Sequence, residues 1–165
     1  MLPLTIHTAQ KLSDLLTNEN ALEQAINTLA ASANLTLPAI TSSGVVLSSA
    51  SADIADKDFQ LTYPRVCLYS TAVKNTQIEK FRSLSGTVAV IAELWASANL
   101  LQNADQWIHF YVEALTNILR QSIGDWGDGM FFSGVYDVQF QPPKLGGFGY
   151  IESAKVTCNV DVSRN

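Results

Sequence analysis

The sequence predicts an α+β domain whose mainly antiparallel sheet of four to five strands carries a long helix and an N-terminal helix. Apolar residues recur at helical spacing in two long segments, and they alternate with polar residues in several others. A helical segment, a loose segment, two strands, a long helix and a C-terminal β-hairpin follow one another, which is an order typical of α+β domains. The length of 165 residues corresponds to a single domain, residues 1–165.

The first helical segment spans about residues 8–31, and its apolar stripe is interrupted by the sequence T-N-E-N at residues 17–20. Asn20 suits the N-cap of a second helix, and Glu23, three residues later, would complete a capping box. We therefore expect either one kinked helix or two short helices.

The next segment, at about residues 32–60, is dominated by Ser, Ala, Thr and Asp. Such a composition buries little apolar surface on its own. The segment is either a mobile loop or linker, or an extended arm that becomes ordered only against a neighbouring subunit. In the second case residues 44–47, with the sequence G-V-V-L, would form the strand of the arm.

Two strands are expected in the middle of the chain, at residues 63–70 and 86–96. The even positions of the second strand are apolar, and its odd positions include Ala89, Ile91 and Trp95. A strand that is apolar on both faces is typical of the centre of a sheet covered on both sides. We expect a helix on one side and a partner on the other, which makes Trp95 a candidate for a subunit interface.

The connection between these two strands is polar and carries Lys74, Lys80 and Arg82. Exposed charges of this kind contribute little to stability when they pair. We interpret them as solvated surface rather than as a salt-bridged interface.

The longest helix is expected at about residues 99–122, with an apolar stripe that packs on the sheet. His109 lies in this helix, but the sequence around it contains no Ser, Cys or carboxylate in a nucleophile motif. A catalytic histidine needs such a partner, so we interpret His109 as structural.

The C-terminal strands, at residues 130–140 and 150–162, alternate between apolar and polar residues. A loop of about nine residues joins them, which predicts an antiparallel hairpin with an extended tip. The glycines of that loop, at positions 146, 147 and 149, open no helix and are therefore not a dinucleotide-binding motif.

Composition argues against several classes of function. The net charge is −5, and the ten lysine and arginine residues are scattered, so direct DNA binding is not expected. The two cysteines, Cys67 and Cys158, do not have the spacing of a metal site. Cys158 falls on the same face of its strand as Val156 and Val160, so it should pack as a small hydrophobic residue. No apolar run approaches membrane-spanning length. We expect no catalytic residue, cofactor, metal or membrane partner, and hence no enzyme.

The C-terminal half carries a family resemblance. Residues 124–138 read G-D-W-G-D-G-M-F-F-S-G-V-Y-D-V, the loop at 142–149 reads P-P-K-L-G-G-F-G, and the chain ends with V-T-C-N-V-D-V-S-R-N. This order of elements resembles small neck and tail-completion proteins of long-tailed bacteriophages. It is most similar to the tail terminators, the group typified by the minor tail protein U of phage lambda, over about residues 60–165.

The resemblance implies a structural virion protein that forms a ring of its own copies, usually a hexamer. The ring would cap the tail tube protein, stop polymerisation of the tube and provide the docking face for the head connector. DNA would pass through the lumen without specific binding. The protein would lie in the neck of the virion, and in the host cytoplasm during assembly. The alternatives are a head–tail connector or stopper in the same neck, a binding module unrelated to phage, and a small enzyme.

On this resemblance we assign residues to two surfaces. The candidates for contact with an adjacent subunit are Trp126, Met130 and Phe131, together with Trp95; Trp126 could instead fold back over the end of the preceding helix. The candidates for docking on the tube or connector are Pro142, Pro143, Lys144, Leu145 and Phe148. The loop that contains them could instead be an ordinary exposed hairpin loop. Deleting residues 143–147 should then leave folding intact and abolish the joining of heads to tails.

Overall fold

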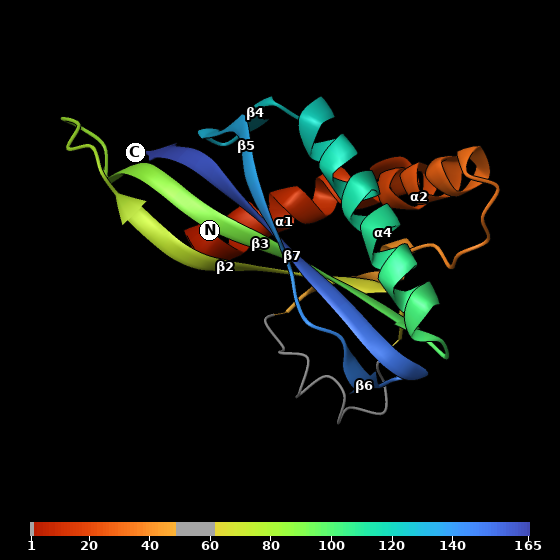
Figure 1. Cartoon of the computed structure of the whole chain (residues 1–165). Coiled ribbons are helices and arrows are strands. Elements are labelled where there is room, and N and C mark those ends of the chain that lie inside the picture. The colour runs from red at the N-terminus through yellow and green to blue at the C-terminus, as the bar shows by residue number, and fades with distance from the viewer. Residues whose placement is uncertain (1, 49–61) are drawn as a thin grey trace.

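The computed structural model describes residues 2–48 and 62–165, which form one sheet and the helices packed on it (Figure 1). The α-helices are α1 (Leu4–Thr17), α2 (Ala21–Ser32) and α4 (Leu101–Gln121). The strands are β1 (Val45–Leu47), β2 (Arg65–Asn75), β3 (Leu84–Ala98), β4 (Gly124–Gly127), β5 (Met130–Phe140), β6 (Lys144–Gly146) and β7 (Gly149–Arg164).

The sheet has seven strands in the order β1-β2-β3-β7-β5-β4, with β6 paired to β7. Every pairing is antiparallel except that of β1 with β2. The mixed α/β architecture and the antiparallel character match the expectation, whereas the sheet is larger than the four to five strands predicted. The two strands that were missed, β4 and β6, are four and three residues long and contain glycine, so they are too short to show a period of two.

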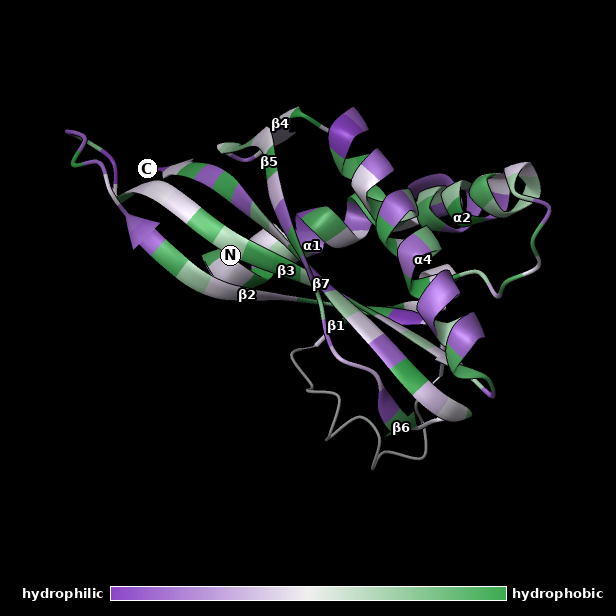
Figure 2. Cartoon of the chain, viewed as in Figure 1, coloured by the Kyte–Doolittle hydropathy of each residue, from purple (hydrophilic) through white to green (hydrophobic). Residues whose placement is uncertain are grey.

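One face of the sheet carries the apolar core. The even positions of β3 and β7 point towards α1 and α4, and Figure 2 shows the alternating bands of hydrophobic and hydrophilic residues along these strands. Each large apolar side chain that is fully buried there contributes roughly 1.5–3 kcal/mol. The α4 residues in the same core include Ile108, Tyr111 and Leu115, all at most 1% exposed. The predicted long helix, central strand and C-terminal hairpin are confirmed.

The N-terminal helical segment is two helices, joined by the short 3₁₀ turn Asn18–Asn20. The predicted interruption is confirmed, but the predicted capping box does not form. Glu19 and Asn20 both adopt left-handed backbone conformations, with φ of 50° and 56°, and Asn20 makes no capping hydrogen bond. The Asn20 side chain instead accepts a hydrogen bond from Ser42 Oγ at 3.0 Å, so tertiary contact replaces the local cap.

The Ser- and Ala-rich segment is more involved in the fold than its composition suggested. Leu37 and Ile40 lie in the core, and the Tyr111 hydroxyl donates a hydrogen bond to the Pro38 carbonyl at 2.6 Å. The strand expected at 44–47 exists as β1, but it pairs with β2 of the same chain rather than with a neighbouring subunit. The remainder of the predicted arm, residues 49–60, lies outside the described residues.

The β5–β7 hairpin contains one irregularity that explains a glycine. The register shifts between Phe132 and Tyr136, and Gly134 lies in this bulge with φ of 92°. A Cβ atom there would meet the Ile123 side chain at 2.7 Å. Glycine is therefore required by the backbone conformation, and the exposed end of the Ile123 side chain packs in the space it leaves.

The described helices include none that combines the length and the apolar character needed to cross a lipid bilayer.

Candidate functional site

Within residues 2–48 and 62–165, no three His, Cys, Asp or Glu side chains gather in a way that could hold a metal ion. His109 is exposed on α4, with its Nε2 atom 3.9 Å from Asp105 Oδ1 and its ring packed on Phe140 at 4.6 Å between centroids. Both cysteines are buried, and burial raises the pKa of each thiol, that of Cys158 to about 12. Neither thiol is set up as a nucleophile, because the reactive form is the thiolate.

The turn at residues 124–131 divides the predicted interface residues into different environments. Met130 is 1% exposed and lies in the core, so the expectation that it contacts another subunit is corrected. Trp126 folds back over the end of α4, donating from Nε1 to the Ser122 carbonyl at 2.8 Å and packing on Phe132 at 5.3 Å. Phe131 points to the other side of the sheet and is 49% exposed, so it alone of these three presents a large free apolar surface.

Trp95 is also corrected, because it is fully buried by its own chain. Its indole ring lies beneath the Arg65 guanidinium, whose Cζ is 4.4 Å from the ring centroid, and beside Tyr63 at 6.3 Å. Tyr63 in turn makes an edge contact with Phe148 at 6.0 Å. The odd face of β3 is therefore covered here by distant segments of the same chain, and not by a partner.

This covered region of the odd face contains polar side chains as well as Trp95. Glu93 is 5% exposed and accepts a hydrogen bond from the Tyr69 hydroxyl at 2.8 Å. Ser97 accepts a hydrogen bond from the backbone N–H of Phe148 at 2.8 Å. Burial raises the pKa of Tyr69, and the hydrogen bond to Glu93 adds to the shift, so the hydroxyl stays protonated as the donor. The Ser97 bond holds Phe148 in the loop that follows β5, whereas the Tyr69–Glu93 bond joins β2 to β3.

The predicted docking loop is held at its base, and its most exposed residues are apolar. β6 pairs with β7, and a Cβ at Gly147, where φ is 55°, would lie 2.4 Å from Ser97 Oγ. Leu145 and Phe148 remain 75% and 65% exposed. Pro142 and Pro143 are exposed beside them, and Lys144 lies in β6. The structure thus brings the predicted docking residues together at one end of the sheet.

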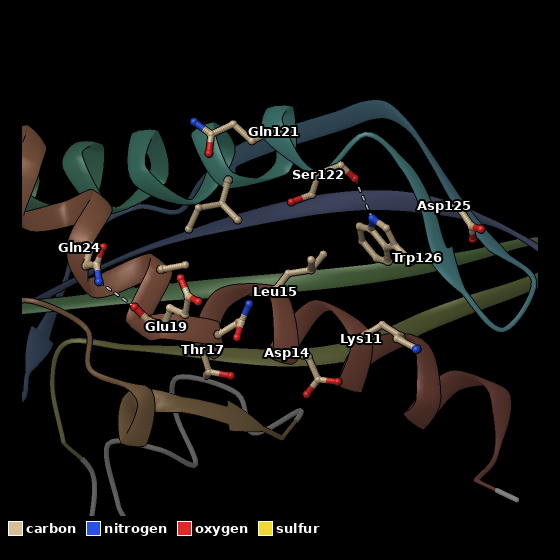
Figure 3. Close-up of a pocket in the computed structure, with 13 residues that line it drawn as sticks. Lys11, Asp14, Leu15, Thr17, Glu19, Gln24, Gln121, Ser122, Asp125 and Trp126 are labelled. Carbon is tan, nitrogen blue, oxygen red and sulfur yellow. Dashed lines mark hydrogen bonds between the residues drawn. The ribbon is translucent and has the colours of Figure 1, made fainter.

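A groove lies between the end of α1, the start of α2 and the end of α4 (Figure 3). Its volume is about 860 Å³. Apolar side chains line it, namely Leu15, Ile118 and Trp126. Three carboxylates also line it, those of Asp14, Glu19 and Asp125, and all three are exposed. We call this feature the groove; the sequence offered no sign of it, because its walls come from segments more than ninety residues apart.

The groove is held in shape by short contacts. Trp126 is fixed by its bond to Ser122, and Gln24 donates to the Glu19 carbonyl at 2.8 Å, as Figure 3 shows. Lys11 is the single cationic residue in its lining, and its Nζ lies 2.8 Å from Asp128 Oδ2 in the β4–β5 turn. The hydrogen bond from Lys11 lowers the pKa of the Asp128 carboxyl, so the pair stays charged at neutral pH.

A second surface that sequence reasoning missed is the β2–β3 connection, residues 76–83, which we call the tip. Ile78 is 104% exposed and Phe81 is 91% exposed. The predicted solvated surface therefore also carries two apolar side chains with no cover in the described part of the chain. The available clue was that Ile78 and Phe81 are the two large apolar residues in an otherwise polar stretch, T-Q-I-E-K-F-R-S.

The comparisons with known proteins add no family to these observations. A scan against protein-family models finds no match, and a search of curated proteins finds no significant match.

Proposed function

We propose that this chain is a structural protein of a long-tailed phage virion: a tail terminator that forms a ring, caps the tail tube and offers a docking face to the head connector. In this role Leu145 and Phe148, with Pro142, Pro143 and Lys144, contact the tube or the connector. Phe131 belongs to a contact between subunits. DNA passes through the lumen of the ring without being bound specifically.

The observation that carries this proposal is that uncovered apolar side chains project at both ends of one long sheet. Ile78 and Phe81 lie beyond the end where Leu84 pairs with Arg164. Leu145 and Phe148 lie at the other end, where Ala98 pairs with Tyr150. β3 runs from one end of the sheet to the other, and its 15 residues span a length of about 50 Å.

Such a distribution suits a subunit that connects partners rather than one that performs chemistry. Apolar groups on projecting elements mark surfaces that are covered in an assembly. The sheet between them is rigid, because its three central strands are paired along most of their length. A subunit of this kind builds a ring when the surfaces that join neighbouring copies are different and the rotation between them closes.

Charge is in keeping with the same role. The net charge is −5, and Asp137 and Asp161 are exposed on the sheet face opposite the helices. A lumen wall of negative sign repels the DNA backbone and lets it pass without adhering.

The docking surface is tested by the single substitution Leu145→Ser in a phage that carries this sequence. We replace the deletion of residues 143–147 by this variant because β6 pairs with β7 and Gly147 packs on Ser97, so the deletion would also remove folded contacts. The expected result is a normally folded protein, by circular dichroism, with heads and tails that do not join. Val135→Ser, at a valine of β5 that is 63% exposed, is the control and should assemble normally. Joined particles with Leu145→Ser would contradict the docking assignment.

Disruption of the coding sequence distinguishes a terminator from a head-side stopper. A terminator that is missing leaves overlong tails, whereas a missing stopper leaves tails of normal length without heads. Electron microscopy of the particles gives both readouts. Locating the protein in the virion anywhere other than the head–tail junction would overturn the proposed function.

A further inference from the structure

We propose that the tip of one copy inserts into the groove of the next copy, and that this contact joins neighbouring subunits. As the lateral contact of the ring, it rests on the proposed function. The two surfaces lie on different parts of the chain, and each offers what the other lacks.

The tip is apolar and shaped before it meets a partner. The backbone N–H groups of Thr76 and Gln77 both donate to the Ser85 carbonyl, at 3.1 and 2.9 Å. Arg82 Nε lies 2.9 Å from Glu79 Oε2, and Glu79 also accepts a hydrogen bond from Ser85 Oγ at 3.2 Å. These bonds tie the connection to the start of β3, while Ile78 and Phe81 point into solvent. Contacts that exist before docking reduce the ordering entropy that docking costs.

The groove provides an apolar lining of the right kind for these two side chains. Leu15, Ile118 and Trp126 present aliphatic and aromatic surface within an open volume of about 860 Å³. The exposed carboxylates of Asp14, Glu19 and Asp125 accompany that lining. Polar side chains, among them Thr17, Asn18, Gln24 and Gln121, make up much of the remaining lining. Specific protein interfaces combine apolar contacts with polar and charged groups in this way.

The charges of the two surfaces are opposite. The tip and its base carry Lys74, Lys80 and Arg82 against the single carboxylate of Glu79. Arg82 is engaged by Glu79, whereas Lys74 and Lys80 are exposed and have no ion pair among the described residues. The groove carries three carboxylates against Lys11, which is itself paired with Asp128. Opposite charge steers two such surfaces together and fixes their register.

The occupant of the groove is a second copy and not the same molecule. Figure 1 shows the tip projecting past the end of the sheet, away from α2 and α4, which form walls of the groove. Because tip and groove are different surfaces, each added copy leaves one tip and one groove free. Contacts of this type close into a ring or continue as a chain.

Sedimentation equilibrium of the purified full chain tests the apolar part of this contact. Wild type should self-associate. Phe81→Ser should raise the dissociation constant about thirtyfold, as expected for the loss of an aromatic anchor. Val135→Ser removes an exposed apolar side chain from β5, away from the tip and the groove, and should change the dissociation constant by less than about threefold. A wild type that stays monomeric at all concentrations, or a Phe81→Ser variant that associates like wild type, overturns the inference.

A charge exchange tests the pairing itself. Lys80→Glu and Glu19→Lys should each weaken self-association, because each places like charges on the tip and the groove. Mixing the two variants should restore association to within about threefold of wild type, because every tip then meets a groove of opposite charge. Failure of the mixture to associate overturns the inference, since a merely structural effect of either substitution would not be rescued.

The inference and the proposed function fail in different experiments. If the protein lies at the head–tail junction but Phe81→Ser associates normally, the proposed function stands and the tip–groove contact is wrong. If Phe81→Ser loses self-association while the protein lies elsewhere in the virion, the contact stands and the proposed function is wrong.

Discussion

The two faces of the sheet are built from the same strands but are buried in different ways. On the helix-covered face, β3 contributes Val88, Val90 and Leu94, which are fully buried under apolar side chains of the helices. On the opposite face the same strand contributes Glu93, Trp95 and Ser97, which are covered by loops and directed polar contacts. The rest of that opposite face, towards the β4–β5 turn, is open to solvent.

The two faces differ in the kind of contact that buries their side chains. Apolar burial on the helix side is non-directional, so it depends on volume and tolerates changes that preserve it. The opposite face depends on hydrogen bonds and close approach, so small changes of geometry matter there. The helix side contains the apolar core, whereas the opposite face holds the loop at residues 141–149 through the bond between Ser97 and the Phe148 N–H.

The largest effect is expected from two neighbouring phenylalanines that lie on opposite faces of β5. Phe132 is fully buried on the helix side, so Phe132→Ala should lower the free energy of unfolding by about 3–5 kcal/mol. Phe131 is 49% exposed on the other face, and Phe131→Ala should change it by less than about 1 kcal/mol. Urea unfolding measures both, and equal losses would show that the two faces do not differ as described.

A smaller effect is expected at the base of the docking loop. Gly147→Ala would place a Cβ 2.4 Å from Ser97 Oγ at a backbone φ of 55°, so we expect a loss of about 1–3 kcal/mol in the free energy of unfolding. Gly127→Ala is the control, because its φ of 79° is also positive while the nearest atom, Lys11 Nζ, lies at an ordinary contact distance of 3.6 Å from the new Cβ. Thermal unfolding of both variants separates steric contact from backbone strain, and the packing argument is wrong if Gly127→Ala loses as much.

The smallest effect is expected from Asp128, which fastens the β4–β5 turn to α1 through Lys11 and His7. Its folded-state pKa is lowered, so Asp128 stabilises the fold above the unfolded-state pKa of about 3.9, and this contribution is lost as the pH falls through the folded-state pKa. Asp128→Asn should therefore lower the urea midpoint slightly at pH 7 and leave it unchanged under strongly acidic conditions. Asp161→Asn, on the open face, serves as the control, and a difference that grew on acidification would contradict the assignment.

Local pattern predicted the parts of the fold that depend on near neighbours. The long helix was expected at 99–122 and spans Leu101–Gln121, and the N-terminal segment divides where its stripe was interrupted. The alternation of β5 and β7 likewise predicted their pairing. Of the candidate site, the loop with Leu145 and Phe148 was placed correctly at the end of the C-terminal hairpin, because glycine and proline mark such turns locally.

The sequence by itself therefore determined the helices, the long strands and the faces of β5 and β7 that enter the core, because hydrophobic periodicity is read within a few residues. Only the tertiary structure decided which apolar residues are free. Trp95 resembled an interface residue in the sequence, yet Tyr63 and Arg65 cover it, and Phe148 in turn packs on Tyr63. Phe81 resembled part of a solvated polar connection, yet it projects uncovered, because exposure depends on which remote segments fold over a site.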